Sequence, residues 1–130
     1  MAISRKKSSS NYVKKAAQPK AKRAENLLEK QMLGDLEKRI SMNVGSFLVL
    51  TEEGDPTQIA LAHQKAKSEF LKFGPEMYKI ADRLGGQISY VVADFLESID
   101  VVLHSSEFLD EEKISNCFYT TQRLQQELKS

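Results

Sequence analysis

The sequence predicts an all-α protein: a four-helix bundle preceded by a basic N-terminal arm. Apolar residues recur at intervals of three and four along most of the chain, which keeps their side chains on one face of an α-helix. Signals for β-strands are nearly absent, and glycine, proline and N-capping residues separate four periodic segments. We therefore expect helices over about residues 22–50, 56–73, 75–104 and 108–128, joined by short loops.

Charge divides the chain into two parts. Residues 1–24 hold eight basic side chains and no acid, whereas the other 106 residues hold 11 basic and 18 acidic ones. The basic part has too few apolar side chains to offset the entropy of ordering. We expect residues 1–23 to be a disordered arm and residues 24–130 to form one helical domain. The arm's cations could bind nucleic acid, an acidic protein partner or an anionic membrane surface. They are Arg5, Lys6, Lys7, Lys14, Lys15, Lys20, Lys22 and Arg23.

A long apolar stripe predicts the first helix. Its members follow one another at intervals of four, four, four, four and three residues: Leu28, Met32, Leu36, Ile40, Val44 and Phe47. The last turn, from Phe47 to Leu50, could instead be extended. Further leucines lie beside the stripe, so this helix has more apolar surface than one bundle face would cover. We expect a homodimer or a partner helix to cover the excess.

Asp55 and Pro56 mark the start of the second helix. Asp is a good N-cap, Pro is favoured at the first helical position, and Gln58 can complete a capping box. Its apolar face comprises Ile59, Ala62, Ala66, Phe70 and Phe73. Gly74-Pro75 is expected to end this helix and begin the third, which gives a tight helical hairpin at that point.

The third helix is predicted from the most regular stripe in the chain. Its members are Met77, Ile80, Leu84, Ile88, Val91, Phe95, Ile99 and Val102. Two adjacent glycines, Gly85 and Gly86, interrupt the segment at a cost of about 2 kcal/mol. Because the stripe continues in phase across them, we expect one long helix, straight or bent. A ridge of small residues beside the stripe could let a neighbouring backbone pack closely: Ala81, Gly85, Ser89 and Ala93.

Acidic residues favour the start of the fourth helix between Ser106 and Asp110, since they interact well with a helix N-terminus. Its predicted apolar face comprises Ile114, Cys117, Phe118, Thr121, Leu124 and Leu128. Cys117 is the only cysteine in the chain, and we expect it to be a small core residue.

No known catalytic motif is present in the sequence. Two histidines and one cysteine are too few for a zinc site built mainly from those residues. The acidic clusters lack the spacing of a calcium loop. We therefore expect no enzymatic activity, no cofactor and no metal. No apolar run is long enough to span a bilayer, so we expect an intracellular, soluble protein, in which the basic clusters could serve as a nuclear-import signal.

These features favour a non-enzymatic helical adaptor or accessory protein that acts through protein–protein contacts and its basic arm. A second hypothesis is a nucleic-acid-binding accessory factor, whose arm contacts phosphates. A third comes from Ala62-His63 followed by Lys67 and Gly74, which resembles the motif of histidine phosphotransfer domains. That resemblance implies a four-helix bundle with a solvent-facing phosphoryl acceptor at His63. The family places its lysine about three residues after the histidine, whereas Lys67 lies four residues after it.

Overall fold

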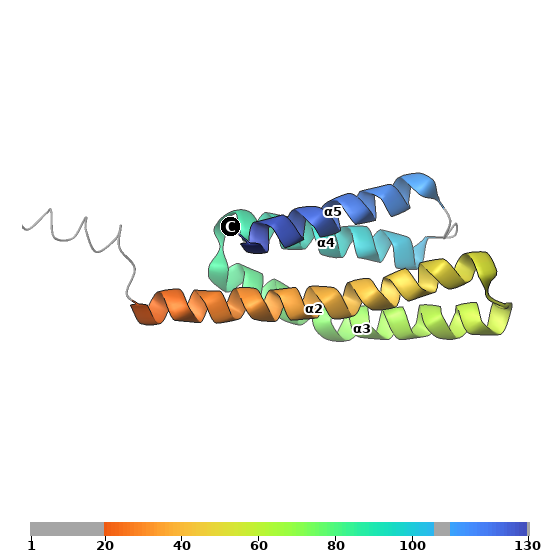
Figure 1. Cartoon of the computed structure of the whole chain (residues 1–130), viewed down its shortest axis with the longest axis horizontal. Helices are drawn as coiled ribbons and strands as arrows, with labels where there is room; N and C mark the ends of the chain where they lie inside the picture. Colours follow the sequence, from red (N-terminus) through yellow and green to blue (C-terminus); the bar gives the residue numbers. More distant parts are fainter. Residues whose placement is uncertain (1–19, 106–109, 130) are drawn as a thin grey trace, which may run out of the picture.

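The computed structural model describes residues 20–105 and 110–129, with side chains described over residues 24–105 and 110–129. These residues form four helices and no strand: α2 (Lys20–Glu53), α3 (Pro56–Leu84), α4 (Gly86–His104) and α5 (Glu111–Lys129). The helices run alternately up and down (Figure 1). Successive helices pack on each other, and α5 closes the bundle against α2 in the smallest of the four contacts. The predicted all-α four-helix bundle is therefore confirmed.

The helices differ in length, and this leaves part of α2 uncovered. α2 has 34 residues and α5 has 19, so they are about 51 Å and 28 Å long. The first turns of α2 extend past the end of the bundle (Figure 1). The predicted stripe member Leu28 is 59% exposed there, whereas Leu33, which lies beside the stripe, is fully buried. Only the part of the stripe from Leu36 onward faces the core.

Both ends of α2 lie beyond their predicted positions. The helix begins at Lys20 and so includes residues 20–23, which we had assigned to the disordered arm. It also continues through Phe47–Leu50, which we thought could be extended, and ends at Glu53. The prediction of disorder for residues 1–19 lies outside the described residues.

The predicted start of the second helix is confirmed in detail. Asp55 is the N-cap of α3: its carboxylate accepts a hydrogen bond from the backbone N–H of Gln58 at 2.9 Å. The Gln58 side chain accepts one in return from the backbone N–H of Asp55 at 3.4 Å, which completes the capping box. Pro56 occupies the first turn, where its missing N–H costs nothing.

The predicted boundary at Gly74-Pro75 is wrong, because α3 runs through both residues to Leu84. Proline deprives the carbonyl four residues earlier of its helical partner. Here Pro75 and Leu71 are both exposed, so water can satisfy that carbonyl. The opposite face of the helix continues without interruption into the core, where Met77 and Ile80 are buried. Burial of this second half of the face offsets the cost of the proline.

The chain reverses instead at Gly85-Gly86, where we had predicted one long helix. Gly85 has φ of 67° and Gly86 has φ of 61°, values that side chains other than glycine rarely adopt. The Gly85 N–H donates to the carbonyl of Ala81 at 2.8 Å and so ends α3. The predicted third helix, 75–104, is therefore divided: its first part belongs to α3 and its second part is α4.

α5 begins at Glu111, slightly later than the predicted residue 108. The carboxylate of Asp110 accepts hydrogen bonds from the backbone N–H groups of Glu112 and Lys113, at 3.0 and 3.3 Å, and so caps the helix. α5 ends at Lys129, close to the predicted end.

All four helices contribute to one core. Its buried apolar residues include Ile40, Val44 and Phe47 of α2, Met77 and Ile80 of α3, Val91, Phe95, Ile99 and Val102 of α4, and Cys117 and Leu124 of α5. Most members of the predicted stripes are either buried in this core or partly buried against it. Phe118, which we placed on the buried face of α5, is instead 63% exposed.

Candidate interaction surface

The cations that we proposed as binding residues lie mostly outside the described part of the chain. This holds for Arg5, Lys6, Lys7, Lys14 and Lys15. Lys20, Lys22 and Arg23 lie in the first turn of α2, where only the backbone is described. That turn projects beyond the bundle (Figure 1).

The predicted ridge of small residues is divided between two helices. Ala81 is buried near the end of α3, whereas Ser89 and Ala93 are half-buried on α4. Gly85 lies at the reversal between them, and a Cβ added there would have no heavy atom within 4 Å. The four residues therefore do not form one continuous helix surface.

His63 is less accessible than the solvent-facing phosphoryl acceptor that the resemblance implies. Its ring is half-buried, with its centroid 5.0 Å from that of Phe47. Its Nε2 lies 2.6 Å from the backbone carbonyl oxygen of Leu103. Phosphoryl transfer to Nε2 would require this hydrogen bond between α3 and α4 to break.

Neither a metal-binding cluster nor a membrane-spanning helix occurs among the described residues. No group of three or more His, Cys, Asp or Glu side chains there could hold a metal ion. No helix in the same part of the chain combines the length and the apolar character needed to cross a bilayer.

An uncharged surface lies where α2 and α5 run side by side. Residues 40–51 of α2 and residues 114–122 of α5 contain no charged side chain, although 28% of the chain is charged. By average composition, 12 residues would carry about three charges. We use the name uncharged face for eight residues of these two stretches that lie at or beside the boundary between the two helices. It comprises Ser41, Met42, Gly45, Leu48 and Val49 of α2 and Ile114, Phe118 and Thr121 of α5.

Large apolar side chains on this face are exposed. Met42 is 71% exposed, Phe118 is 63% exposed and Val49 is 61% exposed. Single exposed apolar residues are common on protein surfaces. Here they occur together with an absence of charge, and protein–protein interfaces are depleted of charged residues at their centres.

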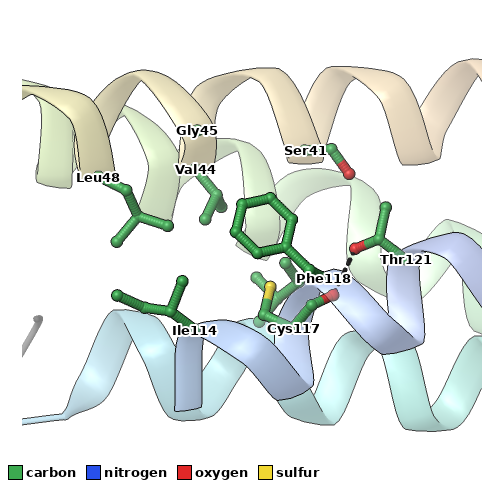
Figure 2. A pocket seen from close by; sticks show the side chains of 9 residues that line it. Ser41, Val44, Gly45, Leu48, Ile114, Cys117, Phe118 and Thr121 are labelled. Atoms are coloured by element: carbon green, nitrogen blue, oxygen red, sulfur yellow. Dashed lines mark hydrogen bonds between the residues drawn. The ribbon is translucent and has the colours of Figure 1, made fainter. Parts of the chain in front are cut away.

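A shallow hollow of about 70 Å³ lies between the two helices within the uncharged face. Its lining residues are Ser41, Val44, Gly45, Leu48, Ile99, Ile114, Cys117, Phe118 and Thr121. Figure 2 shows the Phe118 ring reaching from α5 toward α2, beside Val44 and Ser41. Gly45 leaves the α2 side of the hollow open, because a Cβ there would meet no atom within 4 Å. The hollow has the size of one aliphatic side chain.

Cys117 forms part of the floor of this hollow, and its surroundings favour the neutral thiol. It is 7% exposed, and burial raises the pKa of the thiol above its ordinary value of 9.0. Hydrogen bonds with Ser98 and Thr121 lower the pKa of the thiol, but their effect is smaller than that of burial. The Thr121 hydroxyl also donates to the Cys117 backbone carbonyl at 2.7 Å (Figure 2). A thiol held in its neutral form is a poor nucleophile.

A buried carboxylate lies one turn of α2 away from the hollow. Glu37 is only 2% exposed, and its Oε2 accepts a hydrogen bond from the Ser41 hydroxyl at 2.7 Å. The Gln125 side-chain amide of α5 donates to both carboxylate oxygens, at 3.3 and 3.4 Å. These bonds fix the register of α5 against α2 at the end of the uncharged face.

Sequence reasoning missed Glu37, Met42 and Val49. Two signals in the sequence could have indicated the uncharged face: the charge-free stretches 40–51 and 114–122, read together. Nothing in the sequence showed that the two stretches are neighbours, because this depends on the reversal at Gly85-Gly86. No protein-family model, curated protein or solved structure matches this chain.

Proposed function

We propose that this chain is a non-enzymatic helical adaptor or accessory protein that binds another protein through the uncharged face. The observation that carries the proposal is the exposure of Met42, Val49 and Phe118 on a surface without charge. Contiguous exposed apolar surface is costly in water, and in soluble proteins it commonly marks a binding site.

The hollow beside Gly45 gives this face the shape that a binding partner can use. An apolar side chain of the partner can fill it, and the exposed residues around it can exclude water from that contact. Binding energy would then come from apolar burial, with little contribution from long-range electrostatic attraction.

The proposal can be tested by changing one exposed apolar residue on this face and one elsewhere. Met42→Glu places a charge on the uncharged face, and Leu61→Glu is the matched control because Leu61 is 62% exposed on α3. Both variants should keep the thermal stability of the wild type. Tagged full-length proteins are purified from the source cell, and co-purifying proteins present in stoichiometric amounts are compared.

Met42→Glu should lose these proteins and Leu61→Glu should retain them. If both variants retain the same proteins, or both lose them, the uncharged face is not the binding surface.

A second candidate function is nucleic-acid binding through the basic residues of the N-terminal region. It is favoured by the eight cations without an acid in residues 1–24, which could replace counterions along a phosphate backbone. Because α2 begins at Lys20, deletion of residues 1–19 removes five of these cations and leaves the helix whole.

A gel-shift titration at several salt concentrations checks this candidate. The full chain should bind with a salt dependence corresponding to at most about eight phosphates, and the deleted chain should bind far more weakly. Equal binding by both chains, or no binding at low salt, would show that the arm does not bind nucleic acid.

A further inference from the structure

A row of exposed residues on α2 runs along the edge of the uncharged face. Lys38, Met42, Gly45, Val49 and Glu52 follow one another at intervals of four, three, four and three, and all five are exposed. At about 100° per residue, these intervals place them within one narrow sector of the helix. Four-three spacing is also the repeat by which two helices pack along each other. We call this row the α2 stripe.

The α2 stripe has a symmetric chemical order. Gly45 is at its centre, an apolar residue lies on each side, a cation is at one end and an anion is at the other. Lys38 is seven residues before Gly45 and Glu52 is seven residues after it. If a second α2 helix crosses in the antiparallel direction at Gly45, each lysine therefore comes to the same level as the glutamate of the other helix. Met42 of one helix then lies beside Val49 of the other.

We propose that the partner on the α2 stripe is a second copy of this chain, which pairs its α2 antiparallel to the first about a twofold axis at Gly45. This rests on the proposed function, because it names one occupant of the uncharged face. A parallel pair would set lysine against lysine and glutamate against glutamate, so charge selects the antiparallel direction. In a twofold interface the same residues serve both copies, which the symmetric order of the stripe satisfies.

Three observations support a second copy as the occupant. Within the described part of the chain, neither Lys38 nor Glu52 forms an ion pair, so both can pair with another molecule. Gly45 has open space where a Cβ would be, so two backbones can approach closely there. Phe118, 63% exposed beside Gly45, adds apolar surface from α5 to the same contact.

The length of the stripe limits how strongly it can bind. Lys38 and Glu52 are 14 residues apart, which is about 21 Å of helix. This is a small interface, so we expect a dimer that dissociates at concentrations of about 1 to 100 μM.

The test is a charge exchange measured by sedimentation equilibrium of the full-length protein over this concentration range. Lys38→Glu and Glu52→Lys alone should each weaken dimerisation by about tenfold, because each creates two like-charge pairs. The double variant with both changes should recover the wild-type dissociation constant. The control pair on α3, Lys79→Glu and Glu76→Lys, is exposed away from the stripe and should leave dimerisation unchanged.

Gly45→Ala distinguishes a defect in association from a defect in folding. A methyl group at this position has room within one copy, so the helix should become more stable toward heat. At a twofold axis the same methyl would push two backbones apart, so the dimer should weaken. A more stable protein that associates less strongly is the expected result, and misfolding cannot produce it.

Two results would overturn this inference. One is a wild-type chain that sediments as a monomer up to about 0.1 mM, and the other is a double variant that stays as weak as the single ones. In either case the proposed function is judged separately, by the comparison of Met42→Glu with Leu61→Glu.

Discussion

Three polar side chains are buried among the described residues, and each is held by a hydrogen bond between helices. They are Glu37, Ser98 and Thr120. Ser98 and Thr120 join α4 to α5 through hydroxyl oxygens 2.6 Å apart. Each hydroxyl also lies within hydrogen-bonding distance of a carbonyl on its own helix. Because a hydroxyl has one proton, one of the two donates to its carbonyl while the other donates across the interface.

Glu37 allows the cost of a buried charge to be measured. A buried carboxylate is expensive to desolvate, and its partners, half-buried Ser41 and exposed Gln125, can bind water instead. Glu37→Met keeps the volume without the charge, and we expect it to raise the free energy of unfolding by about 1 kcal/mol. Glu37→Ala should lower it by about 2 kcal/mol because it leaves a cavity. Urea denaturation measures both, and equal losses in the two variants would contradict this interpretation.

Cys117 should make stability depend on pH in the alkaline range. Burial raises its pKa in the folded state above 9.0, so the unfolded chain loses this proton first as pH rises. The free energy of unfolding is then unaffected below pH 9.0 and decreases as pH rises from there through the folded-state pKa. The pKa of Tyr78 is raised from 10.0, first by burial and then by Glu97 and Asp100. Deprotonation of Tyr78 therefore also lowers the free energy of unfolding, at higher pH.

Thermal unfolding between pH 7 and 10 checks this prediction. The wild type should begin to lose stability near pH 9, and Cys117→Ala should show a smaller loss over the next pH unit. The same slope in both proteins would show that the thiol contributes nothing.

At the scale of the helices, some boundaries were predictable from sequence and others were not. The start of α3 could be predicted because Asp55 and Gln58 form a local capping box that needs no other part of the fold. The sequence alone did not show which of the two breaks, Gly74-Pro75 or Gly85-Gly86, ends the helix. Proline within α3 is tolerated because Pro75 faces solvent, while Met77 on the other side of the helix is buried in the core. Tertiary packing decides between two such signals, and a single sequence does not reveal it.

Gly45 and Gly85 differ in backbone conformation, so the same substitution at each position gives a matched comparison of stability. An added Cβ at Gly45 or at Gly85 would meet no atom within 4 Å, so only the backbone differs. Gly45→Ala should raise the free energy of unfolding by about 1 kcal/mol, because Gly45 is in a helix. Gly85→Ala should lower it by about 1 to 3 kcal/mol, because its φ is 67°. Chemical denaturation of both variants measures this. A single helix through Gly85 would instead make both variants more stable.

At the scale of the whole molecule, the sequence predicted the four helices of the described residues and most of the core, but not the proposed binding surface. We had expected the apolar excess of the first helix to need a partner. Leu27 and Leu28 are exposed, whereas Leu33 is buried in the core of the bundle itself. The uncharged face depends on α5 lying against α2, which only the bundle topology establishes. The proposed function therefore depends on one arrangement of two segments that are far apart in sequence.

Site-specific cross-linking tests most directly whether the uncharged face binds protein. A photoreactive phenylalanine analogue replaces Phe118 in the full-length protein, and in a control it replaces Leu71, which is 62% exposed on α3. After irradiation in the source cell, the Phe118 position should give discrete cross-linked protein products, including a second copy of this chain if the α2 helices pair. The Leu71 position should give none of them. Equal cross-linking at both positions, or none at position 118, would contradict the claim that the uncharged face binds protein.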